Sequence, residues 1–192
     1  KILIEKLNAK SVTCGFDYHY GKGGKGNSET MREELGKRNI SFYSAEPVVL
    51  DGEIVSSTEI RKLIREGDIE KANAMLGEYF SYEFTVKKGD GRGRTMGFPT
   101  INQFFSEDFI VPKYGVYMSL TNVDGKNYLS VTNIGTRPTV STDSMRSETC
   151  ILDFSGDLYG KKVQVQLVKF LRDETKFPDI EALTKAIGKD IE

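Results

Sequence analysis

A glycine-rich segment, GDGRGRTMGFPTIN at residues 89–102, combines residue types that could bind phosphate. Glycines let a backbone approach phosphate oxygens closely, and arginines can donate two parallel hydrogen bonds to them. The spacing fits neither a P-loop, which needs G-x-x-x-x-G-K-[ST], nor a dinucleotide fingerprint, which opens a helix. A plain surface hairpin therefore remains an alternative. The candidate phosphate-binding residues of this loop are Gly89, Gly91, Arg92, Gly93, Arg94 and Gly97.

Two polar residues, Thr100 and Asn102, follow the loop at alternate positions. The segment around them, FPTINQFF, contains β-branched and aromatic residues and is predicted to be a strand. Alternate residues of a strand share a face, so both side chains can point toward the space that the glycines leave. A hydroxyl and an amide oxygen are hard ligands of the kind that Mg²⁺ prefers. The alternative is an ordinary polar strand face.

The elements before residue 80 alternate between strands and helices. We predict strands at residues 11–16 and 40–50, a helix at 28–38 capped by Ser28, and helices at 56–67 and 68–77. This order is typical of the last part of a larger α/β domain with a parallel sheet. Lys1 lies in what reads as the end of an amphipathic helix, KILIEKLNAK, so we expect the chain to lack its natural beginning.

After residue 80 the pattern is that of antiparallel strands. Asp124-Gly125 is a hairpin signal, and a final helix is expected at residues 179–191. Short strands at this spacing predict a closed barrel or a sandwich. The six predicted strands are residues 81–89, 98–105, 115–123, 126–135, 147–154 and 161–172.

Composition excludes several classes of protein. The 192 residues carry a net charge of −1 with a pI near 6.0, so no basic excess indicates nucleic acid as the main partner. No apolar run approaches the length of a membrane span. Cys14 and Cys150 are the only cysteines, and they lie in apolar contexts that predict two reduced thiols in a cytoplasmic protein.

An ordered set of motifs resembles the bacterial bifunctional riboflavin kinase/FAD synthetase family over essentially the full chain. GFDYHYGKGGKG at 15–26 and VSSTEIR at 55–61 resemble two synthetase motifs. GRGRTMGFPTIN, NIGTRPT, SETCILDF with DLYG, and FLRDETKF resemble the flavokinase pattern in order and spacing. Ile101 stands where the family usually has alanine, and Cys150 stands where histidine is common.

The resemblance implies a fold with two parts. Residues 1–80 would be the C-terminal part of an FMN adenylyltransferase (FAD synthetase) domain, an incomplete Rossmann-like nucleotidyltransferase. Residues 81–192 would be the riboflavin kinase domain, a six-stranded antiparallel flavokinase β-barrel with a C-terminal helix.

The resemblance also implies a kinase reaction and its site. The γ-phosphoryl of ATP would move to the ribityl 5′-hydroxyl of riboflavin to give FMN, with Thr100 and Asn102 serving Mg²⁺-ATP. Residues 81–192 contain no histidine, and Glu148 matches the family position that activates the flavin hydroxyl. A solvated glutamate at the start of a strand is its alternative. Arg137 and Arg172 would support the flavin or the phosphates, although a surface salt bridge with Asp173 or Glu174 also explains Arg172.

The first part matches the adenylyltransferase only as a remnant. By resemblance Asp17 would face the flavin, and Ser57, Thr58 and Arg61 would hold adenylate or phosphates at a helix N-terminus, where helix capping is the alternative role. The early H-x-G-H motif of that family is absent, so we expect FAD synthesis only from a full-length parent. The expected partners are riboflavin, ATP and FMN, without nucleic acid or membrane. A catalytically silent flavin-binding regulator and a barrel-type RNA-binding module remain alternatives.

Overall fold

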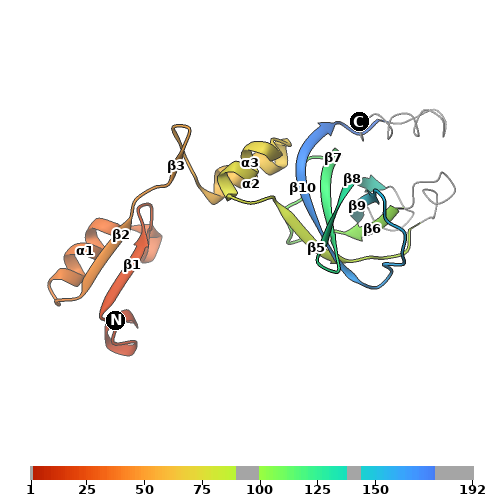
Figure 1. The fold of residues 1–192 in the computed structure, drawn as a ribbon. Coiled ribbons are helices and arrows are strands. Elements are labelled where there is room, and N and C mark those ends of the chain that lie inside the picture. Colours follow the sequence, from red (N-terminus) through yellow and green to blue (C-terminus); the bar gives the residue numbers. More distant parts are fainter. Residues whose placement is uncertain (1, 90–99, 138–143, 176–192) are drawn as a thin grey trace. The chain divides into compact units, whose positions relative to one another are not determined.

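A computed structural model of the chain describes residues 2–89, 100–137 and 144–175. It divides into two units, residues 1–55 and 56–192, which are described separately below (Figure 1). The predicted C-terminal helix at 179–191 lies outside the described residues.

The first unit contains a β-α-β arrangement. Strands β1 (Ser11–Gly15) and β2 (Ser41–Ala45) pair in parallel, and helix α1 (Ser28–Gly36) connects them. Asn27 caps α1 through a capping box with Thr30, so the predicted cap at Ser28 was wrong by one residue. The predicted strand at 40–50 is β2 followed by β3 (Val49–Leu50), which forms a hairpin with β4 (Glu53–Ile54). Short helical turns occur at Ile2–Lys6 and Lys22–Gly24.

Two helices begin the second unit, α2 (Ser57–Glu66) and α3 (Ile69–Leu76). Ser56 accepts a hydrogen bond from the Glu59 backbone N–H and caps α2, while Asp68 caps α3. Gly67 and Gly77 end the two helices in the left-handed conformation that glycine adopts without strain. Both helices lie within the predicted ranges, 56–67 and 68–77.

The six predicted strands after residue 80 are all present. They form one antiparallel sheet in the order β5-β10-β7-β8-β9-β6, which curls into the barrel of Figure 1. This confirms the predicted six-stranded antiparallel barrel. The strands are β5 (Ser81–Thr85), β6 (Thr100–Phe104), β7 (Gly115–Val123), β8 (Lys126–Arg137), β9 (Ser144–Ile151) and β10 (Lys162–Arg172).

The gap between the two edge strands, β5 and β6, is closed by two sets of hydrogen bonds. Just beyond β5, the backbone N–H of Lys87 donates to the carbonyl oxygen of Asn102 at 2.9 Å. The Gln103 amide donates to the carbonyl oxygens of Phe84 at 2.8 Å and Val163 at 2.7 Å. Asn102 therefore belongs to the seam that closes the barrel.

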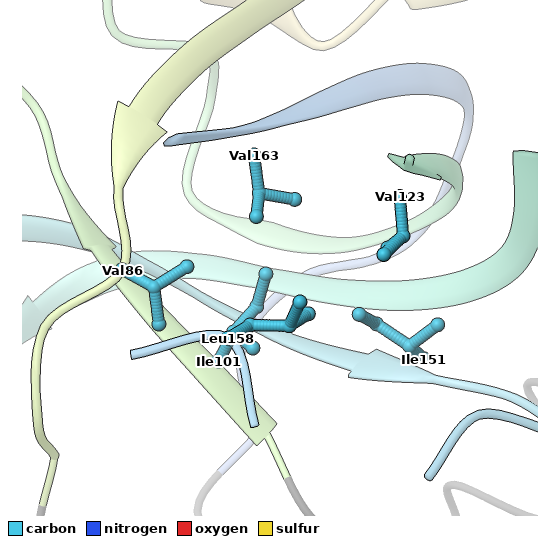
Figure 2. Close-up of a cluster of buried hydrophobic side chains, with 6 residues drawn as sticks. All are labelled: Val86, Ile101, Val123, Ile151, Leu158 and Val163. Atoms are coloured by element: carbon cyan, nitrogen blue, oxygen red, sulfur yellow. The ribbon is translucent and has the colours of Figure 1, made fainter. Parts of the chain in front are cut away.

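The barrel interior is filled by inward-facing residues of all six strands. A cluster of aliphatic side chains fills one region of it (Figure 2) and consists of Val86, Ile101, Val123, Ile151, Leu158 and Val163. The Thr132 hydroxyl lies within hydrogen-bond distance of both the Ser119 and Thr149 hydroxyls, so these three buried hydroxyl groups satisfy one another. Because strand residues alternate, the residues between these core positions face outward.

Candidate functional site

The outward face of β6, β9 and β8 carries a row of polar side chains. Antiparallel pairing places Asn102 of β6 directly opposite Glu148 of β9, and Glu148 directly opposite Asn133 of β8. Residues paired in this way lie on the same face of the sheet, with Cβ atoms about 4.5–5.5 Å apart. Thr100, two residues before Asn102, lies opposite Cys150 on the same face. The structure therefore brings Glu148 next to Thr100 and Asn102, from which it is distant in the sequence.

Asn102 is held tightly although it faces outward. Its exposed fraction is only 6%, and the segment after β5 covers it. A Cβ atom at Gly89 would overlap the Asn102 side-chain amide. Only glycine lets the backbone at position 89 approach so closely, so Gly89 fixes the position of the Asn102 side chain.

Glu148 forms an ion pair with Arg146, which sequence reasoning did not select. The two residues are two positions apart on β9 and therefore share its outward face. The Arg146 side chain is 17% exposed and that of Glu148 is 36% exposed. Glu148 is thus neither fully solvated nor buried. The predicted strand began at residue 147, so Arg146 fell just outside it, and its place two residues before Glu148 was the one available signal.

Asn133 and Glu174 extend the row on the far side of Glu148, and neither was predicted. The Asn133 side-chain amide donates a hydrogen bond to a carboxylate oxygen of Glu174 at 3.0 Å. A Cβ atom at Gly135 would overlap that same carboxylate, so Glu174 lies directly over the β8 backbone. The available signal was that Asn133 and Glu174 belong to the NIGTRPT and FLRDETKF motifs.

Cys150 lies beside the row as a packed thiol. It is buried, and burial raises the pKa of its thiol. A raised pKa leaves little thiolate at neutral pH, which disfavours nucleophilic chemistry. Cys150 therefore acts as an apolar packing residue next to Thr100.

The remaining predicted kinase-site residues are only partly described. Gly91, Arg92, Gly93, Arg94 and Gly97 lie outside the described residues. Arg137 ends β8, and its side chain is not described; Arg172 ends β10 and is partly buried. The neighbouring Asp173 pairs with Lys113 at 2.8 Å, and Glu174 is bonded to Asn133 as described above.

The predicted adenylyltransferase residues fall in both units. Asp17 is exposed in the turn directly after β1, at the carboxyl end of a parallel strand, where α/β sheets commonly bind ligands. Ser57 and Thr58 are exposed in the first turn of α2, and Arg61 is exposed one turn further along. Since Ser56 is the cap, capping does not account for Ser57 or Thr58.

Family models match both parts of the chain. A model described as riboflavin kinase matches residues 76–192, and a model described as FAD synthetase matches residues 1–59. The bifunctional riboflavin kinase/FMN adenylyltransferase of Listeria monocytogenes is 38% identical over 186 residues, which are 96% of this chain and 59% of that protein. The protein of the same description from Pseudomonas fluorescens is 34% identical over 192 residues, covering 100% of this chain and 61% of its own length. The chain thus spans about 60% of the length of these relatives.

A solved structure has the same fold. A crystal structure described as a macrolide-efflux protein from Streptococcus pneumoniae superposes with a TM-score of 0.87 at 30% identity, covering 98% of this chain and 60% of that one. In the described part of the present chain, every helix is too short or too polar to cross a membrane.

Proposed function

Since the chain belongs to the riboflavin kinase family, we propose that it transfers the γ-phosphoryl group of ATP to the 5′-hydroxyl of riboflavin and forms FMN. One observation carries the proposal. The strand register places Glu148 directly opposite Asn102, with Thr100 on the same face. A carboxylate suited to act as a base and two hard oxygen ligands therefore converge on one surface of the barrel, with Gly89 packed against Asn102.

Phosphoryl transfer needs a positioned hydroxyl and neutralised phosphate charge more than it needs covalent chemistry. In the proposed reaction the 5′-oxygen of the ribityl chain forms a bond to the γ-phosphorus. The bond from that phosphorus to the oxygen bridging to ADP breaks, and the hydroxyl proton passes to the Glu148 carboxylate. Arg146 holds that carboxylate through the ion pair.

The donor set fits Mg²⁺. Among the described residues, no group of three or more histidine, cysteine, aspartate or glutamate side chains could hold a metal ion. Mg²⁺ commonly uses few protein ligands and keeps waters and substrate phosphates. The Thr100 hydroxyl and the Asn102 amide oxygen would hold it, and it would neutralise charge on the ATP phosphates. We propose that the loop residues Gly89, Gly91, Arg92, Gly93, Arg94 and Gly97 contact those phosphates.

We do not extend the proposal to adenylyl transfer, which is named for the longer relatives. We propose that residues 1–80 derive from the adenylyltransferase domain and that residues 81–192 act as the kinase. Asp17, Ser57, Thr58 and Arg61 would contribute to FAD synthesis only with an H-x-G-H segment, which this sequence lacks. Arg137 and Arg172 would support flavin or phosphate. The free thiols of Cys14 and Cys150 and the use of ATP suit a cytoplasmic protein.

The test is product analysis. The purified 192-residue chain is incubated with riboflavin, ATP and Mg²⁺, and riboflavin, FMN and FAD are separated by chromatography with fluorescence detection. We expect FMN alone, with loss of activity in EDTA and recovery when Mg²⁺ is added back. FAD would contradict the proposal for residues 1–80. The absence of FMN would overturn the kinase proposal, and a flavin fluorescence titration would then detect a catalytically silent flavin-binding protein.

A further inference from the structure

The polar row contains a buried acceptor that the proposed kinase chemistry does not use. The side-chain oxygen Oδ1 of Asn133 is buried and has no hydrogen-bond partner among the described residues. An unpaired buried polar atom lowers the stability of the fold, because it has lost its water without gaining another partner. Such an atom in a site is therefore a place where a donor from a ligand would be stabilised.

The orientation of the Asn133 amide follows from its neighbour. An ionised carboxylate only accepts hydrogen bonds, so the amide nitrogen must face Glu174, to which it donates at 3.0 Å. The amide oxygen is consequently turned away from Glu174. Gly135 keeps the carboxylate close to the β8 backbone, because any side chain at position 135 would displace it. Glu174 and Gly135 together fix which end of the Asn133 amide is available.

The position of this acceptor matches the substrate of the proposed reaction. Asn133 lies directly opposite Glu148 in the strand register. The ribityl chain carries a secondary hydroxyl on the carbon next to the 5′-position, and a hydroxyl donates one hydrogen bond. Two adjacent hydroxyls of one chain can therefore meet two adjacent acceptors, Glu148 and Asn133.

We propose that Asn133 Oδ1 accepts a hydrogen bond from the 4′-hydroxyl of the ribityl chain, and that Glu174 is a positioning residue that orients the Asn133 amide. This inference rests on the proposed kinase function and names a specificity determinant within it. The 4′ contact places the 5′-hydroxyl at Glu148. A site built to accept a substrate hydroxyl discriminates against analogues that lack it.

The experiment compares riboflavin with an analogue in which the 4′-hydroxyl is replaced by hydrogen. For each variant, kcat/KM and the dissociation constant from flavin fluorescence are measured with both compounds. We expect the wild type to prefer riboflavin by about 10- to 100-fold, which corresponds to one hydrogen bond to a buried acceptor. Asn133→Ala should abolish this preference, since the acceptor is gone.

Glu174→Gln tests the positioning role separately. A glutamine can donate as well as accept, so the Asn133 amide is no longer held in one orientation, and the preference should shrink by several-fold. The matched control is Asn127→Ala, which changes an exposed asparagine on the same outward face of β8. The Asn127→Ala variant should prefer riboflavin over the 4′-deoxy analogue by the same factor as the wild type.

The outcomes separate this inference from the kinase proposal. If the wild type forms FMN but Asn133→Ala lowers kcat/KM equally for both compounds, Asn133 is structural and the inference is overturned. An unchanged preference in Asn133→Ala overturns it as well. If the wild type forms no FMN, the kinase proposal fails, and the ratio of the two dissociation constants still decides whether Asn133 contacts the 4′-hydroxyl.

Discussion

The first unit leaves most of its large apolar side chains exposed, whereas the barrel buries its own. In the described part of residues 1–55, Met31 and Leu35 are the only buried hydrophobic residues. Apolar side chains on several of its elements are largely exposed, including Ile2 and Leu7 at 66%, Tyr43 at 63% and Val48 at 67%. The barrel strands bury theirs; for example, Tyr117, Ile134, Val165 and Leu167 are 0% exposed.

The contrast shows that regular secondary structure and stability are separate properties. The first unit has correct helix capping and a well-paired parallel strand pair, yet a two-stranded sheet with little buried area is marginal in water. Each fully buried aliphatic or aromatic side chain contributes about 1.5–3 kcal/mol, and the barrel has many of them. The proposed kinase function follows the same division, because Thr100, Asn102 and Glu148 all belong to strands of the barrel.

Amide hydrogen exchange should show the largest difference between the two regions. Barrel amides exchange only when the barrel opens, so those of β7 and β10 should be protected about 10⁴-fold or more. Those of β1 and β2 should exchange nearly as fast as in an unfolded chain. Mass-spectrometric exchange at neutral pH measures both regions in one sample. Equal protection of β1 and β10 would mean that the first unit is as stable as the barrel.

Glu148→Gln should produce the next largest effect. Glutamine keeps the shape but cannot take the hydroxyl proton, so the kcat for FMN formation should fall by about 10²–10⁴-fold. Glu34→Gln in the first unit is the matched control, because Glu34 is also paired with an arginine, Arg38. Its kcat should stay at the wild-type level. A fully active Glu148→Gln variant would show that the proton leaves by another route.

Asn73→Ala should destabilise the barrel by about 2–4 kcal/mol. The Asn73 amide donates to the Leu167 carbonyl at 2.9 Å and accepts from the Phe80 backbone N–H at 2.7 Å. Its loss therefore removes a hydrogen bond from the backbone just before β5 and another from the backbone of β10. Urea unfolding monitored by tyrosine fluorescence gives the change in free energy. Asn27→Ala removes the α1 cap and should leave the barrel transition in place. If Asn73→Ala had no effect, α2 and α3 would not depend on the barrel.

Gly89→Ala should raise the KM for Mg²⁺-ATP by about 10-fold through displacement of Asn102, whose amide a new Cβ would overlap. Gly36→Ala in the first unit is the control, since a Cβ there meets nothing within 4 Å. Steady-state kinetics with saturating riboflavin measure both variants. An unchanged KM for Gly89→Ala would show that the position of the Asn102 side chain does not affect nucleotide binding.

Thiol labelling should give the smallest difference. Because burial raises the pKa of the Cys150 thiol, less of it is thiolate at pH 8, and iodoacetamide should label it about 5-fold more slowly than the partly exposed Cys14. Raising the pH should speed Cys150 labelling beyond the pH at which an ordinary thiol levels off. In denaturant the two rates should converge, which serves as the control. Faster native labelling of Cys150 would contradict its packed position.

The barrel strands were predictable because their signals are local. Alternating apolar residues mark β7 and β8, and Asp124 and Gly125 adopt the positive φ angles, 51° and 83°, that their hairpin requires. The predicted bounds of strand β9 were wrong at both ends, since the prediction was 147–154 and the structure has Ser144–Ile151. Asp153 has a φ of 54° in the turn that follows, so the strand ends before the aspartate.

Only part of the candidate site was predictable, because the rest of it depends on contacts between residues distant in the sequence. Thr100, Asn102 and Glu148 were recognised from spacing and family resemblance. Arg146, Asn133 and Glu174 were not, because their importance depends on strand register and on a contact between β8 and the chain beyond β10. Register is set by the packing of the whole barrel, which local sequence patterns do not contain. The attachment of α3 through Asn73 depends on β10 in the same way.

The strand order has a consequence for synthesis on the ribosome. Strand β10 lies between β5 and β7 but is the last of the described strands to be made. Until residues 162–172 emerge, β5 lacks its strand partner and has only the few hydrogen bonds that join it to β6. The Asn73 amide likewise cannot form its hydrogen bond to the Leu167 carbonyl until β10 has been made. Pairing across such a sequence separation is slow. A nascent chain arrested before Lys162 would expose the edges of β5 and β7 together, and open strand edges of this kind are sites at which chains aggregate.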